Sequence, residues 1–100
     1  MTKKRVVITG MGVVSPVGST VEKFWKSLIE GKSGIRPVTH FDPIAFDSRI
    51  NGDIIDYDPL AHFNSKDARN LSRFIQFGVV AANEALAQAK LDIRQMNPYR

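Results

Sequence analysis

The hydrophobic pattern at the start of the chain predicts a short, buried β-strand. Val6, Val7 and Ile8 are consecutive β-branched residues with no polar alternation, which is typical of a strand that helices cover on both faces. The basic residues Lys3 to Arg5 precede this run and mark its solvent end. Such a strand needs neighbours for its backbone N–H and C=O groups, and no later segment offers an evident parallel partner. We therefore expect the partner strands to lie outside these 100 residues.

Residues 19–31 have the pattern of an amphipathic helix. Ser19 and Glu22 fit a capping box, in which the hydroxyl and the carboxylate each satisfy a free backbone amide. Gly31 is placed to end the helix. The expected apolar face, with Trp25 as a core residue, consists of Val21, Phe24, Trp25, Leu28 and Ile29.

Glycine and proline divide the segment from Lys32 to Pro59 into turns and short extended pieces, of which Ile50–Ile55 fits a strand. The segment is rich in aspartate and contains His40. Its acids lack the spacing of a calcium loop, and neither His40 nor His62 has a paired carboxylate at metal-ligand spacing. We expect solvated turn residues, partly buried structural histidines and no metal site.

A second helical region begins after Asn64 and Ser65. If it is one continuous helix, Lys66, Arg69 and Arg73 form a row of three cations on one face. Alternatively, Ser72 caps a new helix and leaves a short basic helix before it. From Phe74 the pattern predicts a buried helix that needs a large partner surface, with a face made of Ile75, Gly78, Val79, Ala82, Ala85, Leu86 and Ala89.

The glycines that follow the first strand resemble a dinucleotide-binding turn that fails at two positions. Ser15 stands where the third glycine is needed, and Pro16 removes a backbone donor where the loop would offer amides to a phosphate. We expect Gly10 and Gly12 to serve tight turns and close backbone approach instead. A degenerate NAD(P)-binding domain stays as an alternative.

Composition narrows the range of chemistry. The hydrophobic fraction, 43%, is that of a globular chain, and no apolar run is long enough to cross a bilayer, so we expect a cytoplasmic protein without a membrane partner. The chain has no cysteine, which excludes a thiol nucleophile among these residues. A net charge of +4, spread along the chain without interleaved aromatic residues, does not favour nucleic-acid binding.

Five blocks of sequence together resemble the start of the β-ketoacyl-acyl-carrier-protein synthases, most closely the elongating type II enzymes of bacterial fatty-acid synthesis. The similarity runs over essentially all 100 residues, in order, and its blocks are Arg5–Gly18, Phe24–Trp25, Gly31–Ile35, Phe41–Asp42 and Ser72–Phe77.

The resemblance implies an α/β fold, with residues 1–100 as the N-terminal part of a thiolase-like layered αβαβα domain that is incomplete at its C-terminus. In that family a decarboxylative Claisen condensation joins malonyl-carrier protein to an acyl group held on a cysteine, and two histidines stabilise the developing oxyanions. This chain has no cysteine, and its two histidines do not match the family's motifs. The sequence therefore predicts no catalytic residue, cofactor or metal ligand here, and no activity for the chain alone.

The same resemblance implies two partners. One is an acidic, phosphopantetheinylated acyl carrier protein, for which Lys66 and Arg69 lie where the family has its docking cations. The family often has a further cation at the position of Asn70, and Arg73, one turn on, is a partial replacement for it. The other partner is a second copy in a homodimer. A freestanding small α/β binding module is the remaining alternative.

Overall fold

The chain is a series of helices joined by long irregular segments. The computed structural model describes residues 2–99. Its helices are α1 (Val21–Ile29), α2 (Ser65–Asn70) and α3 (Arg73–Ala89), with the 3-10 helices η1 (Pro59–Ala61) and η2 (Ile93–Gln95). The strands β1 (Arg36–Pro37) and β2 (Ile50–Asn51) pair antiparallel, with Arg36 opposite Asn51 and Pro37 opposite Ile50. The helix break after α2 confirms the second of the two arrangements expected around Ser72.

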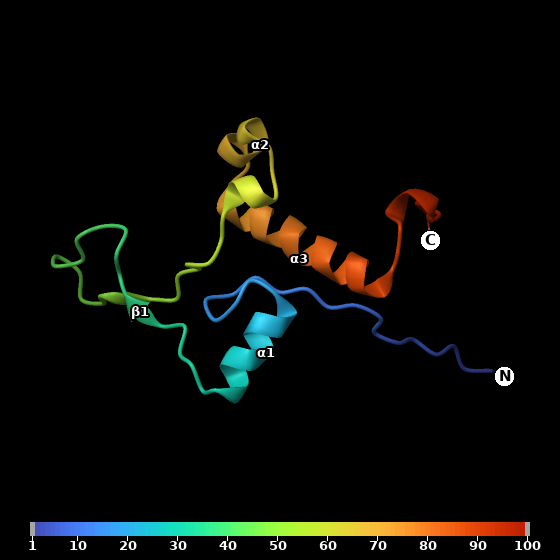
Figure 1. Ribbon diagram of the computed structural model, residues 1–100, viewed down its shortest axis with the longest axis horizontal. Helices are drawn as coiled ribbons and strands as arrows, with labels where there is room; N and C mark the ends of the chain where they lie inside the picture. The colour runs from blue at the N-terminus through green and yellow to red at the C-terminus, as the bar shows by residue number, and fades with distance from the viewer. Residues whose placement is uncertain (1, 100) are drawn as a thin grey trace.

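The molecule is open, and few of its side chains are buried. Its radius of gyration is 17.7 Å, whereas a compact domain of this length has about 13 Å. Figure 1 shows α2, the β1–β2 arm and the N-terminal segment projecting in different directions from the centre. Among the residues described, only Val80 forms a buried hydrophobic core, and Gln76 is the one buried polar side chain.

The N-terminal segment is extended but has no strand partner in this structure. Val6, Val7 and Ile8 are 94%, 67% and 85% exposed, and no strand is assigned to them. The expectation of a buried strand is therefore wrong for the residues described. Its physical reason stands, because no described segment lies where it could pair with this backbone.

Past the exposed run, the same segment passes very close to α3. A Cβ atom placed on Gly10 would lie 2.0 Å from the backbone oxygen of Ala85, and one on Gly12 would lie 1.7 Å from that of Ala81. In Figure 1 the segment runs between α1 and α3. Both glycines therefore allow close backbone approach, as the sequence predicts.

The two ends of α1 differ in how well the sequence predicts them. Thr20, not Ser19, is the N-cap, and its hydroxyl accepts a hydrogen bond from the Lys23 amide, so the expected capping box is wrong. At the other end Gly31 adopts a φ of 68°. Its amide and that of Lys32 donate to the Leu28 and Ser27 carbonyls, which is a Schellman motif and confirms the predicted stop.

Trp25 is 61% exposed and α1 has no buried residue among those described, so the expectation that Trp25 is a core residue is wrong here. The apolar face of α1 has no described partner large enough to cover it.

The paired strands support an arm that projects from the rest of the chain (Figure 1). Only Ile50–Asn51 of the expected strand Ile50–Ile55 is paired. The Arg36 guanidinium holds the base of the arm, because it donates to the carbonyls of Gly34, Asp53 and Pro16.

The face of α3 that packs overlaps the predicted one only in part. The expected stripe includes Gly78 and Ala82, but both are exposed. Ala85, Leu86 and Ala89 of the expected stripe are half-buried, and the packed face also includes Gln76, Phe77, Val80, Ala81 and Glu84.

Candidate functional site

Helix α2 presents the two cations singled out by the sequence. The Asn64 side chain caps it by accepting from the Asp67 amide at 2.8 Å and donating to the Asp67 carboxylate at 3.0 Å. Lys66 and Arg69 are three residues apart, so they lie on the same side of the helix about 5–6 Å apart at Cβ. Arg69 donates from Nε to the Ser65 carbonyl, and neither cation forms an ion pair within residues 2–99.

A buried glutamine holds α2 against α3. Gln76 is 2% exposed, and its Nε2 donates to the carbonyls of Ala68 and Leu71 at 3.1 and 2.8 Å. Its Oε1 accepts from the Tyr57 hydroxyl at 2.6 Å. One side chain therefore satisfies two carbonyls at the end of α2 and fixes where that helix points.

Arg73 does not extend the row of cations, because it belongs to α3. Its guanidinium lies over the rings of Tyr57 and Phe77, 5.7 and 5.1 Å from their centroids, and donates to the Ile54 carbonyl. Tyr57 also packs edge-on against Phe77 and stacks on His62. These contacts give Arg73 a packing role, and the row of three cations, which required one continuous helix, does not form.

Two acceptors on α3 hold the extended segment and the start of α1. The Glu84 carboxylate accepts from the Val13 amide through Oε1 and from the Val21 amide through Oε2, each at 3.0 Å. The Gln88 side-chain oxygen Oε1 accepts from the Met11 amide at 2.7 Å. The amides that a dinucleotide pyrophosphate would use here are bonded to α3, and one of the acceptors is an anion. This arrangement argues against the NAD(P)-binding alternative.

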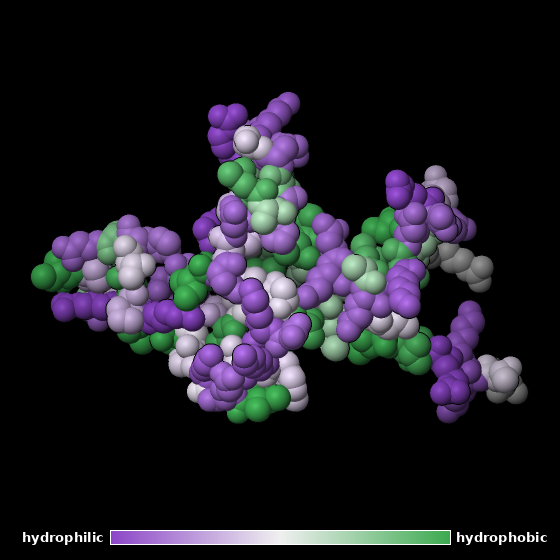
Figure 2. All heavy atoms as spheres, in the orientation of Figure 1, coloured by the Kyte–Doolittle hydropathy of each residue, from purple (hydrophilic) through white to green (hydrophobic). Residues whose placement is uncertain are grey.

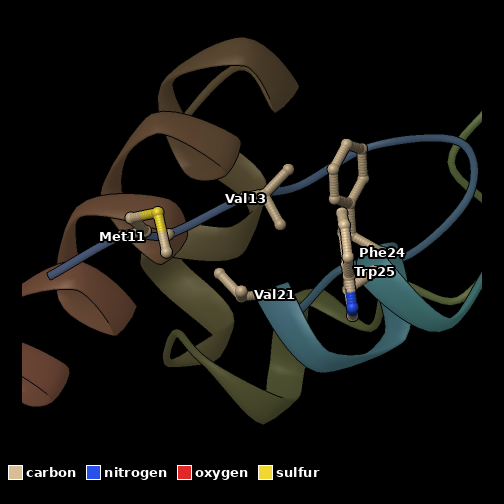
Figure 3. A pocket seen from close by; sticks show the side chains of 6 residues that line it. Met11, Val13, Val21, Phe24 and Trp25 are labelled. Carbon is tan, nitrogen blue, oxygen red and sulfur yellow. The ribbon is translucent and has the colours of Figure 1, made fainter. Parts of the chain in front are cut away.

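An apolar hollow of about 560 Å³ lies between this segment and α1. Figure 3 shows Met11 and Val13 from the extended segment and Val21, Phe24 and Trp25 from α1 along it, and Gly12 completes its lining. The hollow contains no titratable or nucleophilic side chain, so it carries no chemistry of its own.

The histidines and Ser15 assemble no catalytic group. His40 and His62 are both exposed, so the expectation of partly buried histidines is wrong, and His40 pairs with Asp53 through Nε2. The Ser15 hydroxyl donates to the Gly18 carbonyl. Within residues 2–99 no three metal-binding side chains come together. No helix in the described part of the chain is long and apolar enough to span a bilayer.

The family model described as "Beta-ketoacyl synthase, N-terminal domain" matches residues 3–100. The chain belongs to the β-ketoacyl synthase family. It is 47% identical over its whole length to the 3-oxoacyl-[acyl-carrier-protein] synthase 2 of Vibrio harveyi and 39% identical over 97 residues to that of Synechocystis. It spans about a quarter of the length of these curated relatives, 24% and 23% respectively.

A solved structure shares the arrangement of this synthase-family chain. The ishigamide ketosynthase/chain length factor superposes with a TM-score of 0.77 at 33% identity, over 96% of this chain and 24% of that one. This match confirms the expected fold class, an α/β chain arranged as the N-terminal part of a thiolase-like layered fold. It also accounts for the open shape, since the matched region is one quarter of a much larger molecule.

Polar side chains of α3 hold other segments of this synthase-family chain in place, although the hydrophobic pattern predicts that they face solvent. Gln76 is buried, Glu84 is half-buried and Gln88 is exposed, and all three bond to backbone groups outside α3. A signal for them exists, because polar residues recur at multiples of four along α3 with Val80 between them.

Proposed function

We propose that this chain is the N-terminal portion of a 3-oxoacyl-[acyl-carrier-protein] synthase II-like enzyme, a cytoplasmic homodimer that elongates fatty acids. The reaction would be the decarboxylative condensation of malonyl-carrier protein with an acyl thioester. The observation that carries this proposal is the 47% identity to the Vibrio harveyi synthase 2 over all 100 residues of the chain. The nucleophilic cysteine and the two histidines of the reaction would come from outside these residues.

Within the enzyme, α2 would receive the acyl carrier protein. Carrier proteins of this family are acidic, and Lys66 and Arg69 are exposed, lie on the same side of the helix and have no acidic partner among the described residues. Cations at the rim of an interface speed association and orient the partner more than they hold it. Gln76 and the Asn64 cap would present both side chains in a fixed direction.

The test uses a chimera in which this chain replaces the matching quarter of the Vibrio harveyi synthase 2. Formation of β-ketoacyl product from acyl- and malonyl-carrier protein supports the proposed enzyme, whereas the 100-residue chain alone should form none. Condensation by the isolated chain would contradict the assignment of its chemistry to residues elsewhere.

The docking role has its own variant, Lys66→Glu combined with Arg69→Glu in the chimera. We expect the KM for carrier-bound substrate to rise on the order of tenfold at low salt, chiefly through slower association, and the salt dependence to flatten. Reaction with a small acyl thioester should stay nearly unchanged. Unaltered kinetics with carrier-bound substrate at low salt would remove this role from both residues.

A further inference from the structure

A crevice of about 470 Å³ lies between η1 and α2, next to the two cations. Pro59 and Leu60 of η1 and Ala68 of α2 supply its apolar surface, and Arg69 stands at its rim. The remaining lining residues are Asp58 and Ser65. Figure 2 shows hydrophobic atoms immediately below the hydrophilic atoms of α2 at the top of the view.

The crevice combines an exposed apolar wall with an excess of unpaired positive charge. Leu60 is 64% exposed, although it is anchored on a short helix that Asp58 caps by accepting from the Leu60 amide at 3.0 Å. Asp58 and Asp67, the acids of η1 and α2, both act as helix caps or cap partners. Among residues 2–99, Lys66 and Arg69 have no partner carboxylate.

Its walls are held in place from both sides. The Asn64 cap fixes the first turn of α2. Gln76 accepts from Tyr57, just before η1, and donates to the Ala68 carbonyl on the crevice wall. A preformed surface of this kind loses little conformational entropy when a partner side chain enters it.

We propose that this crevice receives an apolar side chain of the carrier protein, carried on the same helical face as the acids that meet Lys66 and Arg69. The inference rests on the proposed function and names the part of the partner that the docking face holds. The two cations are one helical turn apart, so the complementary acids would also be about one turn apart. An amphipathic acidic helix that displays an apolar residue beside those acids fits both features.

The two parts of the face would then act on different rate constants. Lys66 and Arg69 would set how fast the carrier arrives, and this contribution fades with salt. The crevice would set how long the carrier stays, because desolvated apolar contacts at the centre of an interface mainly govern dissociation. The effect of the crevice should therefore persist at high salt.

The test compares Leu60→Ser with Leu60→Met in the chimera, using the acyl carrier protein of Vibrio harveyi. We expect Leu60→Ser to raise the KM for carrier-bound substrate about three- to tenfold through faster dissociation, equally at low and high salt. Leu60→Met keeps the volume and the apolar character, so it should restore most of the affinity. Turnover of a small acyl thioester should be the same in both variants and in the parent chimera.

A second variant distinguishes a crevice that an apolar side chain enters from a flat apolar surface. Ala68→Leu adds apolar area but fills the space, so the proposal predicts weaker carrier binding, whereas a flat apolar patch would bind more tightly. If the charge-reversal variant impairs carrier kinetics while Leu60→Ser and Ala68→Leu do not, the crevice is not used and the docking face stands. If all three variants behave like the parent, the docking face falls as well. A parallel loss with the small thioester would show that Leu60 is merely structural and overturn the inference.

Discussion

Gly12 illustrates how a single missing side chain decides the packing of the whole segment. Its backbone lies against the Ala81 carbonyl of α3, at a distance that no Cβ atom can occupy. The neighbour is backbone rather than the end of a flexible side chain, so a methyl group there must push the segment away from the helix. This also moves Met11 and Val13 away from their acceptors on α3.

We expect Gly12→Ala to destabilise the chimera by about 1–3 kcal/mol, the usual cost of overpacking. Thermal unfolding followed by circular dichroism would measure it. The matched control is Gly78→Ala, because a Cβ on Gly78 meets nothing within 4 Å and alanine favours a helix by about 1 kcal/mol over glycine. Equal effects of the two substitutions would contradict the close approach at Gly12.

Tyr57 links stability to pH at the alkaline end. Burial raises the pKa of its phenol, and the nearby Arg73 guanidinium offsets this only in part. The neutral phenol is the form that donates to Gln76. Its contribution to stability is therefore complete below the unfolded pKa of about 10 and is lost as the pH rises through the higher folded value.

In the chimera, the ring-carbon resonance of Tyr57, assigned with Tyr57→Phe, should titrate above pH 10. The same variant should lose stability at neutral pH and show a weaker alkaline decline than the parent. A midpoint at or below pH 10 would show that the phenol is not buried against Gln76.

At the scale of elements, Glu84 joins three parts of the chain that hydrophobic contacts leave loosely packed. Its two oxygens bond the extended segment and the first helical amide of α1, and the side chain itself belongs to α3. Negative charge at a helix N-terminus also interacts favourably with the helix dipole. The carboxylate therefore satisfies an N-terminal amide of α1, which is the role expected of a local capping box.

We expect Glu84→Gln to cost about 1–3 kcal/mol of stability in the chimera, because an amide offers one acceptor and turns donors toward the second backbone amide. Amide hydrogen exchange should speed up at Val13 and Val21 while Lys23, capped by Thr20, is affected less. Unchanged protection at both positions would contradict the bridging role. Glu22→Gln is the control, since Glu22 is exposed and takes no part in a cap.

The sequence predicts element ends better than element faces, and the difference has a physical basis. Gly31 stops α1 because a left-handed residue is a local requirement that the sequence states directly. The packed face of α3 is not local. Gln76, Glu84 and Gln88 bond to backbone groups in other segments, and their regular spacing along the helix does not reveal which groups those are.

In the candidate site, too, local features can be predicted from the sequence and contacts between segments cannot. The positions of Lys66 and Arg69 on one short helix are readable from the sequence, since their spacing is local. The crevice beside them depends on how η1 packs on α2, and the diversion of Arg73 depends on Tyr57 and Phe77. The crevice and the Arg73 contacts both join separate segments, and the periodicity within one segment does not predict contacts with another.

At the scale of the whole molecule, exposed apolar surface dominates. Val6 to Ile8, Trp25 and the hollow beside α1 face solvent in this structure. We expect the isolated 100-residue chain to be poorly folded or to aggregate, because unpaired strand edges and large apolar patches favour association. Its near-ultraviolet dichroism from Trp25 should be weak. A sharp two-state melt with dispersed amide resonances would support a freestanding module instead.

The exposed β-branched segment Val6 to Ile8 has a consequence for synthesis on the ribosome. In a synthase with this quarter at its start, Val6 to Ile8 emerge before roughly 400 further residues, which at about 5–20 residues per second leaves them without a sheet for roughly 20–80 seconds. Three cations, Lys3, Lys4 and Arg5, flank the strand directly. Charges in this position act as gatekeepers that discourage nascent chains from pairing edge to edge. The basic start of the chain would thus protect the strand during the interval in which its own sheet does not yet exist.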